Sequence, residues 1–208
     1  MANTAAVLNG YLTSALKDPS HATWTSGEKD TLILRAVAEL YPNVTYALAP
    51  QSYTQALTSG TYFYSINAII VKLTRVDWLD SGGVEMGALA DGTWEVTGDL
   101  EAGTAKIHVA PYIADTAGTL RYNGYGRYNT TSVYIPEDYV NLVVADAKLR
   151  AYEWMLSDRM RYKQWSGQAQ KQNVSVTEMV TLVAEARQEY NQLKSRAFVF
   201  RKPSPGRI

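Results

Sequence analysis

The sequence predicts an α+β protein: a helical bundle of about four helices, interrupted by an antiparallel β insertion and followed by an extended C-terminal tail. Helical spacing of apolar residues appears at both ends of the chain, and short β-branched and aromatic runs separated by glycine turns fill its middle. These patterns assign residues 1–60 and 133–196 to a discontinuous helical domain, 61–132 to an inserted β domain and 197–208 to a docking tail.

Composition excludes several classes of protein. Apolar residues make up 46% of the 208 residues and charged residues 19%, which is typical of a globular chain. Lys+Arg and Asp+Glu are equal at 20 each, without the basic excess of a dedicated nucleic-acid binder. Cysteine is absent, which removes disulfides, thiolate metal sites and cysteine nucleophiles. We expect neither a signal peptide nor a membrane span, because no basic residue precedes Lys17 and no apolar run approaches about 18 residues.

Two helices are expected before residue 43. The first covers Thr4–Leu16, or begins only after Gly10, since glycine inside a helix costs about 1 kcal/mol relative to alanine. The second is opened by a capping box, in which Thr25 and Glu28 satisfy each other's free backbone N–H groups. Its apolar stripe consists of Leu32, Ile33, Ala36, Val37 and Leu40.

The β insertion follows a segment, 43–59, that we interpret as a loop. Period-two alternation and β-branched or aromatic residues predict short strands, separated by turns such as Asp80–Gly83. The expected strands are 61–66, 68–78, 93–96, 105–110, 119–125 and 133–135. Together they favour a small antiparallel sheet or a compact barrel.

A long helix follows Pro136, a residue suited to the first helical position because its missing N–H has no intrahelical partner there. Glu137 and Asp138 place negative charge at the positive end of the helix dipole. The apolar face comprises Val140, Val143, Val144, Ala147, Ala151, Trp154 and Met155. The opposite face comprises Asn141, Lys148 and Glu153.

The rest of the chain is interpreted as a polar loop with one helical turn at 160–173 and then a last helix. Ser175 and Glu178 form a second capping box, and the helix runs to about Arg196. Its apolar face comprises Met179, Leu182, Val183, Ala186, Tyr190 and Leu193. The tail 197–208 contains two prolines and a glycine and is not expected to continue the helix.

A search for catalytic chemistry finds no complete motif. His21 and His108 have no companion ligands at metal-binding spacing. Ser14-x-x-Lys17 lacks the partner motifs of the serine enzymes that use this pattern, and Gly124-x-Gly126 lacks the third glycine of a dinucleotide loop. No residue is therefore assigned a catalytic, cofactor or metal role, and an enzyme is not expected. A glycosidase-type carboxylate pair would have to come from the turn residues Asp77, Asp80, Glu85, Asp91 and Asp99.

The tail is the candidate binding segment. Its two phenylalanines alternate with Val199 and are followed by basic residues, as in extended segments that pair with a sheet edge or lie in a groove. The alternative is a frayed terminus. The candidate partner-binding residues are Phe198, Phe200, Arg201, Lys202 and Arg207.

Several local motifs, in order, resemble the head-to-tail connector (adaptor or neck) proteins of tailed bacteriophages. Asp18-Pro19 precedes Trp24-Thr25 and Glu28 at a helix start, and Tyr41-Pro42 ends that helix. After the β insertion, Ile135-Pro136-Glu137-Asp138-Tyr139 opens the long helix. Glu189-Tyr190 and Arg196 lie in the last helix before the tail.

The resemblance implies a structural role in the virion neck. Such adaptors form a ring, commonly of twelve copies, beneath the portal protein, and they extend the DNA channel towards a downstream neck or tail protein. DNA would pass without sequence-specific binding, no cofactor or membrane would be involved, and the tail would reach the portal. Lys148 and Glu153 would be candidates for subunit contact. The alternatives are another phage tail or baseplate module whose β domain binds protein or glycan, and an enzyme.

Overall fold

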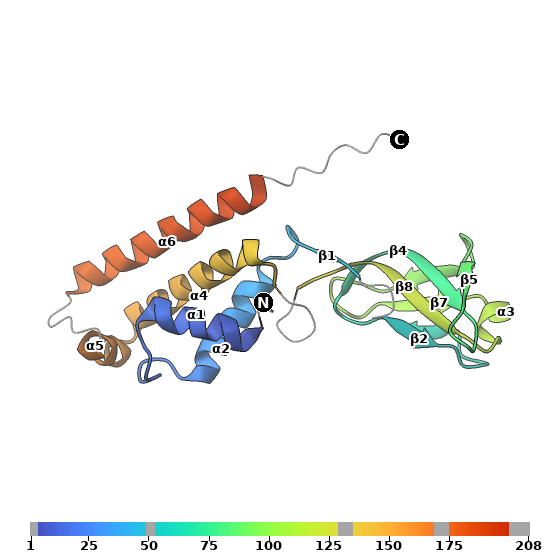
Figure 1. Ribbon diagram of the computed structural model, residues 1–208, viewed down its shortest axis with the longest axis horizontal. Coiled ribbons are helices and arrows are strands. Elements are labelled where there is room, and N and C mark those ends of the chain that lie inside the picture. Colours follow the sequence, from blue (N-terminus) through green and yellow to red (C-terminus); the bar gives the residue numbers. More distant parts are fainter. Residues whose placement is uncertain (1–3, 49–52, 129–134, 169–174, 200–208) are drawn as a thin grey trace. The chain divides into compact units, whose positions relative to one another are not determined.

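The computed structural model describes residues 4–48, 53–128, 135–168 and 175–199 (Figure 1). The chain divides into two compact units. The first, here called the helical unit, combines Met1–Asn43 with Tyr128–Ile208. The second, the β unit, is Val44–Arg127. Each unit is described separately below.

The predicted bundle of about four helices with a small β insertion is wrong. The described residues form an α+β structure with six helices and two antiparallel sheets, including a curled half-barrel. Two of these six helices were not predicted from the sequence. One is a single turn, and the other is polar and has no apolar periodicity, so neither shows a helical pattern. The helices are α1 (Ala5–Leu16), α2 (Ser26–Ala38), α3 (Pro111–Ala114), α4 (Glu137–Ser157), α5 (Arg159–Gln168) and α6 (Val176–Val199).

Helices α1 and α2 follow the predicted pattern closely. Helix α1 continues through Gly10 and ends at Lys17, whose left-handed backbone (φ 53°) turns the chain. The capping box at the start of α2 is confirmed, because Thr25 and Glu28 exchange side-chain to backbone hydrogen bonds. All five residues of the predicted α2 stripe are buried.

A buried ion pair organises the turn between α1 and α2. The side chains of Lys29 and Asp18 are both fully buried, with Nζ and Oδ2 3.1 Å apart. Lys29 Nζ also donates to the Asp18 backbone oxygen (3.0 Å) and to Thr13 Oγ1 (3.2 Å). The Asp18 carboxylate accepts hydrogen bonds from the three backbone N–H groups of residues 22–24. Every charged atom of the pair thus has partners, which buried charges require.

Helix α4 is the centre of the helical unit. It contacts α1, α2, α5 and α6, and Pro136 occupies its N-cap position. The sequence assigned α4 one apolar face, but its buried residues occur around most of the helix. They are Tyr139, Val140, Leu142, Val143, Ala145, Asp146, Ala147, Leu149, Ala151, Tyr152 and Met155.

Helix α6 covers the face of α4 that the sequence suggested for contact with other subunits. Lys148 pairs with Glu189 of α6 (2.8 Å), and Glu153 pairs with Arg187 of α6 (2.6 Å). Both side chains are therefore engaged inside the unit, and Figure 1 shows α6 running along α4. We therefore no longer expect Lys148 and Glu153 to contact another subunit.

Helix α5 replaces most of the predicted polar loop at 160–173. Trp165 is buried and donates its indole N–H to the backbone oxygen of Leu16 (3.0 Å), one of the carbonyls left free at the end of α1. Arg161 donates to Thr23 O and to the Glu28 carboxylate. The Arg161 hydrogen bonds lower the pKa of Glu28 to about 2. Helix α5 is thus held by its side chains despite its polar sequence.

The capping box that opens α6 is confirmed, since Glu178 accepts from the Ser175 N–H and Ser175 Oγ accepts from the Glu178 N–H. Helix α6 reaches Val199, three residues beyond the predicted end at Arg196. Helix breakers occur only from Pro203 onward. The first residues assigned to the tail are therefore helical.

The β unit contains two antiparallel sheets. One has the order β1-β8-β4-β5, with β2 also paired to β8; the other has the order β3-β7-β6. Two short strands lie in the segment interpreted as a loop, and β5 was also missed, because runs this short show no clear alternation. The strands are β1 (Tyr46–Ala47), β2 (Thr54–Ala56), β3 (Phe63–Ser65), β4 (Ile70–Leu79), β5 (Glu85–Ala88), β6 (Trp94–Thr97), β7 (Lys106–Val109) and β8 (Thr119–Gly126). Of the strand expected at 133–135, residues 133 and 134 lie outside the described residues, and Ile135 lies in no strand.

Strands β4 and β8 pair along most of their length, with register shifts between Ile70 and Lys72 and between Leu73 and Arg75. Gly124 lies opposite these irregularities, where a Cβ atom would be 2.0 Å from the Lys72 backbone oxygen. The first glycine of the Gly124-x-Gly126 pattern thus allows close backbone approach in a curled sheet. The core of the β unit is formed by Leu48, Tyr64, Ile66, Ile70, Val76, Ala105, Ile107, Val109, Ile113, Leu120 and Tyr122.

Lys29→Met should lower the free energy of unfolding of the helical unit by about 3–5 kcal/mol, because Asp18 would remain buried without a countercharge. Urea denaturation followed by circular dichroism measures the loss. Lys148→Met is the matched control: its partner Glu189 is half exposed, so we expect less than about 1 kcal/mol. Equal losses in the two variants would contradict a stabilising role for the buried pair.

Candidate functional site

The predicted docking tail starts at the end of α6, and the structure describes that starting point. The backbone places Phe198 in the last turn of α6. Phe200, Arg201, Lys202 and Arg207 lie outside the described residues. Their role in binding a partner therefore stays a prediction.

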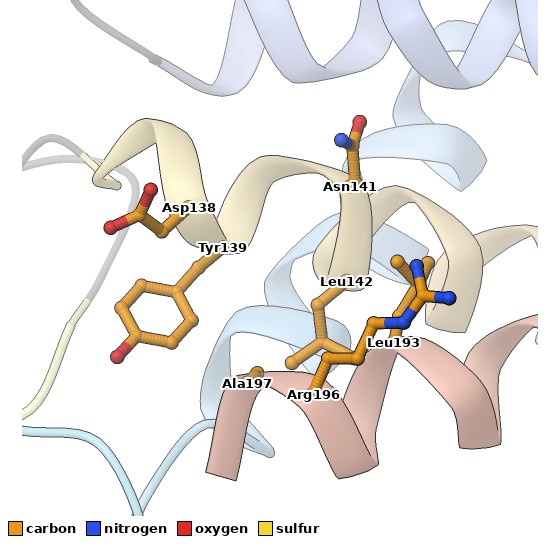
Figure 2. Close-up of a pocket in the computed structure, with 7 residues that line it drawn as sticks. All are labelled: Asp138, Tyr139, Asn141, Leu142, Leu193, Arg196 and Ala197. Carbon is orange, nitrogen blue, oxygen red and sulfur yellow. The ribbon is translucent and has the colours of Figure 1, made fainter. Parts of the chain in front are cut away.

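A pocket of about 430 Å³ lies beside the last turns of α6, where they pass the first turns of α4 (Figure 2). Tyr139 and Leu142 point from α4 towards α6, whereas Asn141 points away from it. The lining residues come from two segments about fifty positions apart in the chain. They are Asp138, Tyr139, Asn141, Leu142, Leu193, Arg196 and Ala197.

The floor of this α4–α6 pocket is apolar and its rim is polar. Tyr139 and Leu142 are almost completely buried, and Leu193 is half-buried. The exposed side chains of Asp138 and Arg196 supply one negative and one positive charge at the rim. An apolar floor with a few polar groups suits the binding of an apolar side chain. The lining residues offer no nucleophile paired with a base, so the arrangement fits binding better than catalysis.

The β unit gathers charged side chains into one network on β4, β5 and β8. Asp77 has only 2% of its side chain exposed and accepts hydrogen bonds from Arg75, Arg121 (2.6 Å) and Asn123 (2.8 Å). Glu85 binds the same two arginines. Asp77 and Glu85 are two of the five carboxylates considered for a glycosidase pair, and both bind Arg75 and Arg121.

The electrostatics of this network oppose acid catalysis. Burial raises the pKa of Asp77, but hydrogen bonds from Arg121, Asn123 and Arg75 outweigh burial and hold that pKa below its usual range. A general acid at neutral pH needs a raised pKa. The network is neutral in sum, with two carboxylates and two guanidinium groups, and its geometry is that of a cross-strand ionic link.

Two of the three remaining turn carboxylates, Asp80 and Asp99, stabilise local backbone. Asp80 Oδ1 accepts the N–H groups of Gly82 and Val84, both at 2.8 Å. Asp99 Oδ1 accepts those of Glu101 and Ala102. These side chains have structural partners that account for their position in the turns.

The histidines belong to different units. His21 Nδ1 lies 3.1 Å from Lys29 Nζ, next to the buried ion pair. His108 stacks on Phe63, with ring centroids 4.7 Å apart, and its Nδ1 lies 3.5 Å from Glu95. Across the part of the chain that the structure describes, no three or more metal-ligating side chains gather in one place. Ser14 donates to the Gly10 backbone oxygen, and Lys17 forms the C-cap of α1.

Sequence reasoning missed the α4–α6 pocket and the buried pair of Lys29 and Asp18 because each needs contact between separate segments. Of the apolar residues that line the pocket, only Leu193 belongs to a predicted apolar stripe, and Tyr139 and Leu142 lie outside the face assigned to α4. Within the described residues, none of the helices combines the length and apolar character needed to cross a bilayer.

Comparison with known proteins adds no relative: no protein-family model matches the chain, and no curated protein matches it.

Asp77→Asn should flatten the acid dependence of β-unit stability. Because the folded-state pKa of Asp77 is lowered, its stabilisation is present above the unfolded pKa of about 3.9 and is lost as pH falls through the lower folded value. Thermal unfolding of wild type and variant from neutral pH down to about pH 2 measures the difference. Asp91→Asn, at an exposed turn, is the control and should follow the wild-type curve. An Asp77→Asn profile parallel to wild type would show that the network adds no acid-sensitive stability.

Proposed function

We propose that the protein is a structural virion component: a head-to-tail adaptor that forms a ring beneath the portal of a tailed bacteriophage and joins it to the next neck or tail protein. The order of the chain carries the proposal. The helical unit is interrupted at Asn43 and resumes at Tyr128, with the β unit inserted between. Pro136-Glu137-Asp138 then opens α4, the central helix. This is the layout of the adaptor family that the sequence resembles.

The surface of the helical unit supports a role in assembly. Several large apolar side chains are exposed, with Met160 at 68%. Large exposed apolar side chains supply binding energy when another protein covers them. Those of the helical unit are Tyr11, Leu34, Trp154, Leu156, Met160 and Val180.

Charge supports the same role. The formal net charge is zero. The described ion pairs also engage basic side chains on several elements, including Lys29, Arg75, Arg121, Lys148 and Arg187. A channel that lets DNA pass needs weak phosphate binding, because each additional phosphate contact strengthens retention of the DNA. We therefore infer a sequence-independent, weak interaction with DNA and no cofactor.

A second candidate is a phage tail or baseplate module whose β unit binds a glycan or a protein. One observation favours it: Phe63, His108 and Glu95 form a row across β3, β7 and β6, and 54% of Phe63 is exposed. A hollow of about 240 Å³ adjoins Glu95 and His108. An exposed aromatic ring beside a carboxylate and an imidazole offers both a stacking surface and hydrogen bonds.

The adaptor proposal predicts rings. Negative-stain electron microscopy of the purified chain, alone and mixed with portal, should show closed rings with a central opening, and native mass spectrometry should give one multiple of the 23.1 kDa chain. We expect twelve copies. A monomer under both conditions would exclude the adaptor. A monomer or trimer that binds a glycan array, and loses this binding in Phe63→Ala, would favour the second candidate.

Removal of residues 201–208 should leave the fold intact and weaken attachment to the portal. The deletion keeps all of α6 and removes Arg201, Lys202 and Arg207. Circular dichroism tests folding, and co-sedimentation of the truncated chain with portal rings tests attachment. Unchanged saturation of portal by the truncated chain would show that these basic residues do not dock.

A further inference from the structure

Strand β6 is an open edge of the β unit. The second sheet has the order β3-β7-β6, so β6 pairs with β7 on one side, and no described strand pairs with its other side. Another chain can add a strand to such an edge through backbone hydrogen bonds. The four residues of β6, Trp94–Thr97, include neither lysine nor proline, two residues with which proteins commonly block an edge.

The backbone groups that face the open edge follow from the register of the ladder. Residues of an antiparallel strand direct their N–H and C=O groups alternately to one side and to the other. The Ala110 N–H on β7 donates to Thr93 O (2.9 Å), so Thr93 and every second residue after it face β7. The N–H and C=O groups of Trp94 and Val96 therefore point away from β7, and no described residue bonds to them there.

The two faces of β6 differ in character. Trp94 and Val96 are half-buried and pack against the core of the β unit. Glu95 lies between them on the opposite face, with 67% of its side chain exposed. A strand added beside β6 would place apolar residues next to Trp94 and Val96 and one polar residue next to Glu95.

Glu95 has no lysine or arginine partner among the described residues. Its ion-pair partner is His108, whose Nδ1 lies 3.5 Å from the carboxylate and which is charged only when protonated. The carboxylates of Asp77 and Glu85, by contrast, each bind two arginines. A negative charge at the open edge thus favours a positive side chain on the added strand.

The hollow of about 240 Å³ beside Glu95 provides space for that side chain. Gly92 and Ala110 line it and contribute little or no side chain of their own. The volume suits one long side chain. Lysine fits, because its aliphatic stem packs on apolar atoms while its ammonium group stays beside a carboxylate.

We propose that β6 binds an extended segment of a partner protein as an additional strand, in which apolar residues alternate with polar ones and a lysine lies opposite Glu95. The backbone of Trp94 and Val96 supplies the hydrogen bonds, and Glu95 selects the lysine. Binding at β6 involves the β unit alone and is independent of ring formation. It rests on the binding role that the second candidate function gives to the β unit, and it makes the partner a protein strand and not a glycan.

Two labelled peptides test the choice of partner: Ser-Val-Thr-Val-Lys-Val-Thr-Val-Ser, and the same sequence with glutamate in place of lysine. In fluorescence anisotropy titrations with the full-length chain, the lysine peptide should bind about fivefold more tightly, because opposite charges across a strand pair attract and like charges repel. Glu95→Lys should reverse this order, and the exposed position leaves the core unchanged. Equal affinities of the two peptides in both proteins, or no binding of either at millimolar concentration, would overturn the proposal.

Hydrogen exchange measured by NMR locates the added strand. The amides of Trp94 and Val96 should exchange about tenfold more slowly with the lysine peptide bound, because their N–H groups then have acceptors. Val96→Pro removes one of these N–H groups and leaves the ladder with β7 intact, so it should weaken peptide binding by about fivefold or more. Circular dichroism checks that the variant folds. Unchanged exchange at both amides in the wild-type complex would contradict strand addition.

Phe63→Ala is the control, because Phe63 lies on β3, two strands away from the open edge, and the variant should bind the lysine peptide as wild type does. Glycan binding that this variant abolishes, without binding of the lysine peptide, would overturn the proposal in favour of a glycan partner. Loss of oligomers in Val96→Pro, measured by native mass spectrometry, would mean that a second copy supplies the strand and would also overturn it. A monomer that binds the lysine peptide would exclude the adaptor ring and support strand addition.

Discussion

The stability of the helical unit depends on the packing of other helices against α4 from several sides. Its buried residues occur around most of its circumference, so no single partner helix removes them from water. Helices α1, α2, α5 and α6 each contact it, and they come from both ends of the chain. The β unit can therefore be inserted between α2 and α4 only if the chain returns to complete the same core. This constraint explains why a discontinuous unit folds as one body.

Charged side chains serve this architecture at points where backbone groups need partners. Asp18 accepts three backbone N–H groups in the turn after α1, and Lys29 neutralises it inside the core. Arg161 connects α5 to the capping box of α2 through Glu28. In the β unit, Asp77 and Glu85 join three strands through two arginines. Carboxylates that pattern reasoning considered for catalysis thus have partners whose effect is to stabilise the fold.

The binding features lie at the margins of these cores. The α4–α6 pocket lies where the start of α4 passes the end of α6. Exposed apolar residues on several helices and the aromatic row on β3, β7 and β6 are the other surfaces that offer binding energy. The assembly role that we propose would use such surfaces.

Local patterns in the sequence determined both capping boxes, the stripe of α2, the start of α4 and most of the longer strands, because each depends on residues within a few positions of one another. Tertiary structure decided the rest. Helix α5 has a polar sequence and is held by Trp165 and Arg161 on distant partners. Lys148 and Glu153 have the pattern of solvent-facing residues, but each forms an ion pair with a side chain of α6. The two-residue strand β1 and the three-residue strand β2 are defined by their pairing with β8, which is distant in the chain. Periodicity reports which face of an element is apolar, whereas the choice of partner depends on contacts between segments that are far apart in the chain.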